Sequence, residues 1–232
     1  MDKIPTHIGF IVDGNRRWAR EKGLPTLEGH RRGFDRVEKI AESIFDKGVK
    51  FASFYLFSTE NWDRSTEEVS YLMDILRVNI SRLAKKLQKK GIKLVWLGRI
   101  KPAPDDVIEK IRAAEELTKD GTAGTVAICF NYGGHWEIAD AAKKLHADIN
   151  AGNIKESDIT PSVFAKYLYA PEVPACDLIV RTSGEQRISG FQLWRAAYSE
   201  FLFLDKKFPD MSVDDLDDII AEYNHRSRRF GK

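Results

Sequence analysis

Hydrophobic runs alternate with amphipathic stretches along the chain, and this alternation predicts a succession of strands and helices. Short, mostly apolar runs of strand length cover residues 7–12, 49–57, 92–97, 125–130, 178–180 and 201–204. Apolar residues at helical spacing cover residues 27–46, 65–90, 105–119, 135–151 and 161–169, and a last helix begins behind Ser212. Because strands that alternate with helices form parallel sheets covered on both faces, the predicted fold class is α/β.

Boundary residues support this division of the chain. Ser65 and Glu68 form a capping-box pair at the start of the helix over residues 65–90, and Gly91 ends that helix. No internal repeat, low-complexity tract or linker divides the sequence. We therefore expect a single domain over residues 1–232.

Four of the predicted connections share a composition that ordinary turns do not need. Each follows a predicted strand and combines glycine or small polar residues with charged residues or tryptophan, and the four segments are 13–18, 58–62, 131–136 and 181–185. In parallel sheets, ligands bind beyond the carboxyl ends of the strands. We therefore expect these segments to form one binding site.

Composition limits the classes of protein to consider. The 232 residues include 37 Lys and Arg against 35 Asp and Glu, and 43% are hydrophobic, which is typical of a globular protein. The net charge of +2 argues against binding nucleic acid through bulk charge. The two cysteines, Cys129 and Cys176, exclude a disulfide framework and lack zinc-site spacing. No signal peptide and no apolar run of about 18 residues occurs, so we expect a cytoplasmic protein.

Arginines in two of these regions indicate an anionic ligand. Arg16 and Arg17 follow Asp13 near a helix start, where free backbone N–H groups favour anions. Arg181 and Arg187 come from another strand end. Because the planar guanidinium matches phosphate oxygens, the cluster favours a diphosphate. Asp13, a carboxylate among arginines, is suited to bind Mg²⁺ that bridges to this diphosphate.

The rest of the ligand is inferred from missing motifs and from an apolar stripe. The sequence has neither a G-x-x-x-x-G-K-[ST] motif nor a strand-linked G-x-G-x-x-G motif, so a nucleotide is not supported. One helix carries apolar residues at helical spacing, namely Val69, Leu72, Met73, Leu76, Ile80, Leu83 and Leu87. Such a stripe usually faces a core, and beside a phosphate site it could also line a tunnel for a hydrocarbon tail. The combination suggests a lipid diphosphate.

Five segments, in order, resemble those of cis-prenyltransferases of the undecaprenyl diphosphate synthase type. They are residues 7–19, 29–30, 57–64, 131–134 and 177–189. The resemblance extends over nearly the whole chain, and five matches at matching intervals make it specific. It implies one cis-prenyltransferase catalytic domain over residues 1–232, with a mostly parallel central sheet flanked by helices and a hydrophobic tunnel.

The activity that the resemblance implies is condensation of isopentenyl diphosphate with an allylic diphosphate, geranyl or farnesyl diphosphate. The reaction depends on Mg²⁺ and makes each new double bond Z, which gives a polyprenyl diphosphate. Asp13 would bind Mg²⁺ and assist departure of diphosphate, and Glu200 matches the second metal-site carboxylate. Asn61 matches the position that accepts the proton lost from isopentenyl diphosphate. Because a neutral amide is a weak base, proton transfer to the released diphosphate stays an alternative.

The resemblance also implies which residues bind the two substrates. The allylic diphosphate would be held by Gly14, Asn15, Arg16, Arg17, Trp18 and His30. The floor between the substrates would be formed by Ser58, Thr59 and Glu60, with Trp62 and Arg64 beside it. Isopentenyl diphosphate would be bound by Arg181, Arg187, Ile188 and Ser189.

Further expectations concern assembly and product. The Arg229-x-Gly231 ending resembles the family motif that completes the site across a homodimer interface. The product would associate with the membrane, to which the cytoplasmic enzyme would be peripheral. Thr26 stands where many relatives have arginine, which leaves one diphosphate contact open, and Arg31 or Arg32 could supply it instead. Leu56 stands where long-chain synthases commonly have alanine on the tunnel wall, and its three additional heavy atoms predict a product shorter than C55.

Three other functions are compatible with parts of the sequence. A non-catalytic partner subunit of a prenyltransferase complex would lack the catalytic aspartate and most loop arginines, whereas Asp13, Arg181 and Arg187 are all present. The acidic string 214–218 resembles a motif of the all-helical trans-prenyltransferases, but that class carries two such motifs, and the helix dipole explains this one. The basic residues 226–229 are accompanied by no motif that reads RNA or DNA, so no nucleic acid is expected as a partner.

Overall fold

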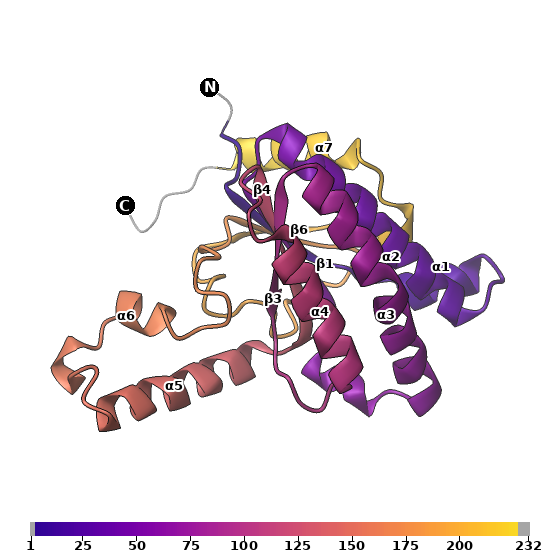
Figure 1. Ribbon diagram of the computed structural model, residues 1–232. Helices are drawn as coiled ribbons and strands as arrows, with labels where there is room; N and C mark the ends of the chain where they lie inside the picture. The colour runs from indigo at the N-terminus through magenta and orange to yellow at the C-terminus, as the bar shows by residue number, and fades with distance from the viewer. Residues whose placement is uncertain (1–2, 227–232) are drawn as a thin grey trace.

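The structure is a computed structural model that describes residues 3–226 (Figure 1). These residues form six strands and seven α-helices. The strands are β1 (His7–Ile11), β2 (Phe51–Ser58), β3 (Ile92–Leu97), β4 (Gly124–Tyr132), β5 (Leu178–Arg181) and β6 (Glu200–Phe203). The α-helices are α1 (Asn15–Glu21), α2 (Thr26–Ser43), α3 (Thr66–Lys89), α4 (Asp105–Thr118), α5 (Gly134–Asn150), α6 (Pro161–Ala165) and α7 (Asp215–His225). Short 3₁₀ helices are η1 (Ile44–Lys47), η2 (Thr59–Asp63), η3 (Glu156–Asp158) and η4 (Phe208–Asp210). The predicted Arg229-x-Gly231 motif lies outside the described residues.

All six strands belong to one parallel sheet, in the order β3-β4-β2-β1-β5-β6. After β1 and β2 the chain forms β3 at the edge of the sheet, inserts β4 between β2 and β3, and then returns to add β5 on the other side of β1. Ile11 at the end of β1 is level with both Tyr55 of β2 and Arg181 of β5. The predicted parallel sheet is confirmed, and the connections after β1, β2 and β5 therefore leave from the same edge, at the point where the strand order reverses.

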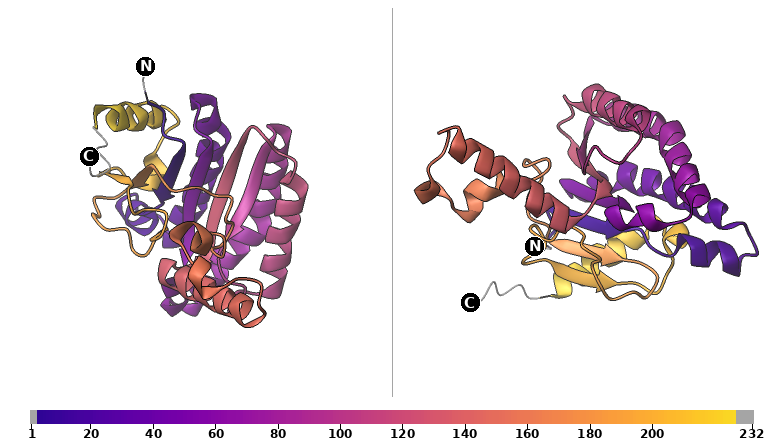
Figure 2. Two further views of the ribbon diagram at one scale, coloured as in Figure 1. Left: turned by 90° about the vertical axis from the view of Figure 1, so that its left-hand side faces the viewer. Right: turned by 90° about the horizontal axis from the view of Figure 1, so that it is seen from below.

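The two faces of the sheet are covered differently (Figures 1 and 2). Helices α2, α3, α4 and α7 pack on one face and bury the larger core, which includes the stacked pair Phe10 and Phe54. The other face is closed mainly by irregular segments, from which Cys176 and Phe191 enter a second core. Phe191 stacks on Tyr55 with ring centroids 5.0 Å apart. The alternation of strands and helices predicts helices on both faces. On this face, loops with large apolar side chains cover the sheet instead.

Helix α5 projects away from the sheet and carries α6 near its far end, so the two helices form an arm (Figures 1 and 2). The predicted helix over 161–169 is shorter than expected: α6 ends at Ala165, while Thr160 caps its start by accepting a hydrogen bond from the Val163 N–H. Among the described residues, no helix has both the length and the apolar character that crossing a membrane requires.

A loop is expected over residues 13–18, whereas the chain enters helix α1 at Asn15. Gly14 makes this abrupt turn with φ of +97°, a conformation that glycine adopts without strain. A Cβ at this position would also lie 2.7 Å from the Ser183 Oγ. The correction matters for the site, because α1 directs its first backbone N–H groups and side chains toward the end of β1.

Candidate active site

Most of the predicted site residues meet at the carboxyl edge of the sheet. They are Asp13 and Gly14 beyond β1; Asn15, Arg16, Arg17 and Trp18 on α1; His30 on α2; Ser58, Thr59, Glu60, Asn61, Trp62 and Arg64 in the connection from β2 to α3; and Arg181, Arg187, Ile188 and Ser189 from the end of β5 onward. Segments more than 150 residues apart in the sequence are thus brought together. Their charged side chains form two groups of contacts, one around Asp13 and one around Glu68.

Asp13 is the centre of the first group, the Asp13 network. Its Oδ2 accepts a hydrogen bond from Arg181 Nη2 at 2.8 Å, and its Oδ1 accepts one from the Gly14 N–H at 2.7 Å. Arg17 Nη2 lies 3.5 Å from the same Oδ2. Partial burial raises the pKa of Asp13, but the hydrogen bonds from Arg181 and Gly14 and the charges of Arg181 and Arg17 outweigh it, so this pKa lies below its ordinary value. Asp13 is therefore a carboxylate at neutral pH.

Arg181 connects Asp13 with the loop after β5. Its Nη1 donates to Ser189 Oγ at 2.8 Å and to the Arg187 carbonyl, which holds this loop against the end of the strand. The side chain is nearly buried, yet its Nε has no hydrogen-bond partner among the described residues. A buried donor without a partner costs free energy and is available to an anionic ligand.

Glu185 connects the two arginine-bearing segments. It accepts a hydrogen bond from Arg17 Nη1 at 2.9 Å and another from Arg187 Nη1. Helix α1 and the loop after β5 are therefore held at a fixed separation, with guanidinium groups on both sides of Asp13. The predicted cluster of arginines is present as an assembled group of donors.

Glu68, on the first turn of α3, is a site residue that the sequence analysis missed. Its Oε1 accepts hydrogen bonds from His30 Nε2 at 3.1 Å and from Arg64 Nη1 at 2.9 Å, and Arg16 Nη1 lies 3.5 Å from its Oε2. Burial lowers the pKa of His30 despite the nearby Glu68, so the imidazole is neutral and donates from Nε2. The sequence explains Glu68 locally, as the partner of Ser65 in a predicted capping box, and so gives no sign of this role. In the structure Ser65 Oγ accepts the Glu68 N–H, whereas the carboxylate is used for His30 and Arg64.

The floor between β2 and α3 is ordered by its own hydrogen bonds. Asn61 Oδ1 accepts the Ser58 N–H at 3.1 Å, which caps η2. Trp62 Nε1 donates to Asn131 Oδ1 at 2.8 Å, and Asn131 has a φ of +50° at the end of β4. Asn131 is a second positioning residue absent from the predicted set, although its segment was singled out. Trp18, by contrast, donates to Asp210 of η4 at 2.6 Å and so lies to one side of the Asp13 network.

Glu200 does not join the other predicted residues. It begins β6 level with Leu178, the first residue of β5, and forms an ion pair with Arg226 at 3.5 Å. Asp13 lies beyond the opposite end of these strands, and at about 3.3 Å per residue the two carboxylates are roughly 15 Å apart along the strand direction. Within one subunit, Asp13 and Glu200 therefore do not hold the same metal ion, which corrects the prediction. The match to the family motif gives no information about the edge of the sheet at which β6 begins.

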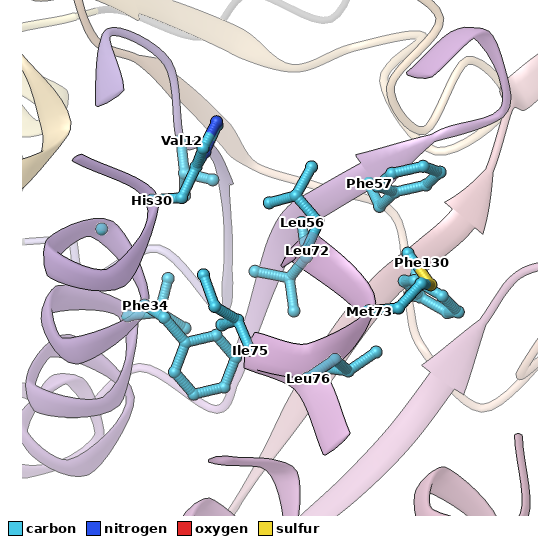
Figure 3. Close-up of a pocket in the computed structure, with 12 residues that line it drawn as sticks. Val12, His30, Phe34, Leu56, Phe57, Leu72, Met73, Ile75, Leu76 and Phe130 are labelled. Carbon is cyan, nitrogen blue, oxygen red and sulfur yellow. The ribbon is translucent and has the colours of Figure 1, made fainter. Parts of the chain in front are cut away.

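An apolar pocket opens beside the charged network (Figure 3). Side chains of α2, α3 and β2 converge on it, and His30 stands near Val12 on one side. Its volume is about 50 Å³, whereas an engineered cavity that binds benzene in another protein has about 150 Å³. Leu56 lines it, as predicted, together with Leu72 and Phe34. The predicted hydrophobic tunnel is present here as a short pocket.

The donor set fits Mg²⁺ that is shared with a substrate. No cluster of three or more His, Cys, Asp or Glu able to hold a metal exists within residues 3–226. Asp13 is one carboxylate, about a third exposed, surrounded by groups that bind phosphate. Because Mg²⁺ is commonly bound by one or two carboxylates together with substrate phosphates, this arrangement suits it and does not suit a metal enclosed by protein ligands alone.

Comparison with known proteins agrees with this geometry. Residues 11–231 match the family described as "Putative undecaprenyl diphosphate synthase". Isoprenyl transferase 2 of Corynebacterium efficiens is 45% identical over 228 residues, which cover 98% of this chain and 94% of that protein. A trans,polycis-polyprenyl diphosphate synthase of Thermobifida fusca, named as (2Z,6E)-farnesyl diphosphate specific, is 43% identical over 98% of this chain and 81% of its own. The crystal structure of lavandulyl diphosphate synthase from Lavandula x intermedia, in complex with dimethylallyl diphosphate, matches with a TM-score of 0.95 and 32% identity over 99% of both chains.

These matches extend over nearly the entire chain and include the five segments on which the resemblance was based. The matched proteins are named as isoprenyl transferases or as synthases of prenyl diphosphates. The chain therefore belongs to the cis-prenyltransferase family and is a prenyltransferase enzyme.

Proposed function

We propose that this enzyme condenses isopentenyl diphosphate with a short allylic diphosphate in the Z configuration, with Mg²⁺ as its cofactor. The observation that carries the proposal is the Asp13–Arg181 pair, which stands between two arginine-bearing segments and next to an apolar pocket. One segment suits the allylic diphosphate and the other isopentenyl diphosphate. The pocket beside them suits the hydrocarbon part of the allylic substrate.

The charged groups account for the chemistry of ionisation. When the allylic C–O bond breaks, negative charge grows on the leaving diphosphate, and preorganised guanidinium and backbone donors stabilise that charge. Arg16 and Arg17, with the N–H groups at the start of α1, are placed for this role. Mg²⁺ shared between Asp13 and the diphosphates would supply further charge neutralisation. Holding both substrates in one site makes carbon–carbon bond formation effectively intramolecular.

The proton that leaves isopentenyl diphosphate needs an acceptor. Asn61 Oδ1 already accepts the Ser58 N–H, and a neutral amide is a weak base. This favours the released diphosphate as the acceptor, with Asn61 fixing the floor on which the two substrates meet. Asn61→Ala is then expected to raise KM and to leave the pH profile of kcat unchanged.

The proposal includes a product shorter than C55, and the size of the apolar pocket supports it. Each added isoprene unit needs apolar space, and the pocket of about 50 Å³ is closed partly by Leu56. The lavandulyl diphosphate synthase with the TM-score of 0.95 is complexed with dimethylallyl diphosphate, which has a single isoprene unit. We expect Leu56→Ala to lengthen the products, as measured by mass analysis. An unchanged product distribution in this variant would contradict the role of Leu56, and Leu117→Ala, on the exposed side of α4, is the matched control.

The reaction is tested by incorporation of radiolabelled isopentenyl diphosphate into products made from dimethylallyl, geranyl and farnesyl diphosphate in parallel. Activity of the isolated protein that is lost on chelation of Mg²⁺ is the expected result. Activity that requires a second, different chain would instead support the non-catalytic subunit. The stereochemistry of the new double bond, read by NMR of the product, decides between Z and E.

A homodimer is part of the same proposal. It is supported by the resemblance of the Arg229-x-Gly231 ending to the family motif that completes the site of the partner. Mixing two inactive variants, Asp13→Ala and Arg229→Ala, tests it, because mixed dimers would contain one intact site. Recovery of activity on mixing is the expected result, and none would be recovered by a monomer.

A further inference from the structure

A second basic region lies beside helix α5, which leaves the body of the molecule as Figure 1 shows. The connection between β3 and α4, one face of α5 and the segment after α6 surround a groove of about 720 Å³. Six cationic side chains line it, namely Arg99, Lys101, Arg112, Lys143, Lys144 and Lys166. Asp140 is the only carboxylate among the residues described as lining this groove.

The cations of this groove exceed their carboxylate partners. The partners are Asp140 for Arg99 and Lys143, Asp105 for Lys101, and Glu115 for Arg112. Neither Lys144 nor Lys166 has an ion pair within the described part of the chain. The Lys144 ammonium lies instead 5.6 Å from the centroid of the Tyr169 ring. The groove therefore has positive charge that its own residues do not neutralise.

Aromatic rings hold two of the guanidinium groups in place. Arg99 lies over Trp136, 4.1 Å from the ring centroid, and its Nε donates to Asp140 at 3.0 Å. Arg112 lies over Trp96 at 5.0 Å. Stacking of this kind reduces the conformational freedom that a guanidinium loses when it binds an anion. The groove thus presents ordered planar donors together with flexible lysines.

The groove is separate from the active site described above. Asn131 stands between them: its Nδ2 donates to the Arg99 carbonyl at 2.6 Å and to the Lys101 carbonyl at 3.1 Å, and its Oδ1 accepts from Trp62. The groove wall and the active-site floor are therefore two sides of one hydrogen-bonded partition. A ligand in the groove would not touch the Asp13 network.

We propose that this groove is a second anion site, which binds a ligand carrying phosphate groups. Its volume lies within the range of roughly 300–1,000 Å³ that is usual for sites of small molecules. Its concave shape suits a discrete headgroup or metabolite better than the flat surface of a bilayer. Guanidinium forks and ammonium groups together are the donors that recognise phosphate oxygens. A phospholipid headgroup and a soluble phosphorylated compound share this chemistry.

Isothermal titration with inorganic diphosphate tests the proposal. Because the active site is expected to bind two diphosphates and the groove one, the wild type should show up to three sites per chain. Lys144→Ala/Lys166→Ala should weaken one of them by roughly 10- to 30-fold. Lys85→Ala/Lys89→Ala, which removes two exposed lysines of α3, should retain all of these sites. Arg181→Ala should weaken diphosphate binding in the active site and retain the groove site, so that failure of the groove and failure of the active site are distinguished.

Two results would overturn the proposal. One is diphosphate binding by Lys144→Ala/Lys166→Ala that equals that of the wild type; the other is equal weakening in the two lysine variants, which would indicate unspecific attraction. Cosedimentation with vesicles of phosphatidylcholine, with and without phosphatidylglycerol, then shows whether the ligand is a phospholipid headgroup or a soluble phosphorylated compound. Binding to the anionic vesicles that requires Lys144 and Lys166 assigns a lipid headgroup, and binding of diphosphate alone assigns a soluble ligand.

Discussion

Two arginine–carboxylate pairs in this protein have opposite characters. Arg195 and Glu137 lie in the interior with side chains 3% and 0% exposed, at 2.6 Å from Nη1 to Oε1. Arg181 and Asp13 form an equally direct pair at 2.8 Å, but Asp13 is 31% exposed. The side-chain nitrogen and oxygen atoms of the first pair are hydrogen-bonded within the protein. In the second pair, one nitrogen of Arg181 has no hydrogen-bond partner among the described residues.

The surroundings of each pair explain the difference. Arg195 donates from Nε to the Val173 carbonyl and from Nη2 to the Tyr169 carbonyl, and Glu137 also accepts the Tyr132 hydroxyl. This network fastens the start of the α5 arm to the loops that close the second face of the sheet. Arg181 Nε, in contrast, has no partner in residues 3–226. A buried charge pair therefore stabilises the fold where all of its donors and acceptors have partners. Where a donor has no partner, the pair is suited to bind a ligand.

The largest effect is expected from the structural pair. Arg195→Met leaves the carboxylate of Glu137 buried without its cation, which should cost about 3–5 kcal/mol of the free energy of unfolding. Chemical denaturation followed by circular dichroism measures it. Lys119→Ala, which breaks the exposed pair with Glu116, is the control and should leave the free energy of unfolding nearly unchanged. A loss of similar size in both variants would refute the structural role.

Asp13→Asn should reduce the activity of the enzyme, whereas Arg195→Met should reduce its stability. It keeps the shape of the side chain and removes the charge and the proposed Mg²⁺ ligand, so kcat should fall by roughly 10²–10³ while stability changes little. Steady-state incorporation of isopentenyl diphosphate and thermal denaturation measure the two quantities. Asp63→Asn, an exposed carboxylate on η2, is the matched control. If Asp13→Asn kept full activity, the proposed role of Asp13 would be wrong.

The free energy of unfolding should also depend on pH, through a buried histidine near Arg195. His7 is fully buried; it donates from Nδ1 to the Pro174 carbonyl and accepts from Ser53 at Nε2, and burial lowers its pKa to about 4, with a smaller contribution from the charge of Arg195. Because the unfolded chain binds this proton near pH 6.5, the stabilisation is complete above that pH and is lost toward pH 4. The loss should approach about 3 kcal/mol.

Stability measured between pH 7 and 4 tests this expectation. Each point is a denaturation midpoint converted to a free energy of unfolding. In His7→Gln, which cannot be protonated in this range, that part of the dependence should disappear even though the variant is less stable throughout. A variant with the wild-type slope would show that His7 does not titrate as proposed.

The same contrast explains what could be predicted from the sequence. The strands, the parallel sheet and the charged edge followed from apolar runs and from strand-end loops, because these are local patterns with a known spatial consequence. The pair Arg195–Glu137 and the position of Glu200 depend on contacts and register between distant segments, for which a single sequence has no local signal. Helix α1 is not predicted, because Asp13-Gly14-Asn15 after a strand indicates a turn and gives no sign of the helix that begins at Asn15.

Glu68 is intermediate between the two regions, and its effect should be the smallest. It is nearly buried, like Glu137, but its partners His30, Arg64 and Arg16 belong to the active site. Glu68→Gln retains an acceptor and removes the charge, so the arginines should lose orientation and KM for the allylic diphosphate should rise about tenfold with little change in kcat. Glu67→Gln, exposed on the same helical turn, is the control. An unchanged KM with reduced stability would place Glu68 with Glu137 among the structural carboxylates.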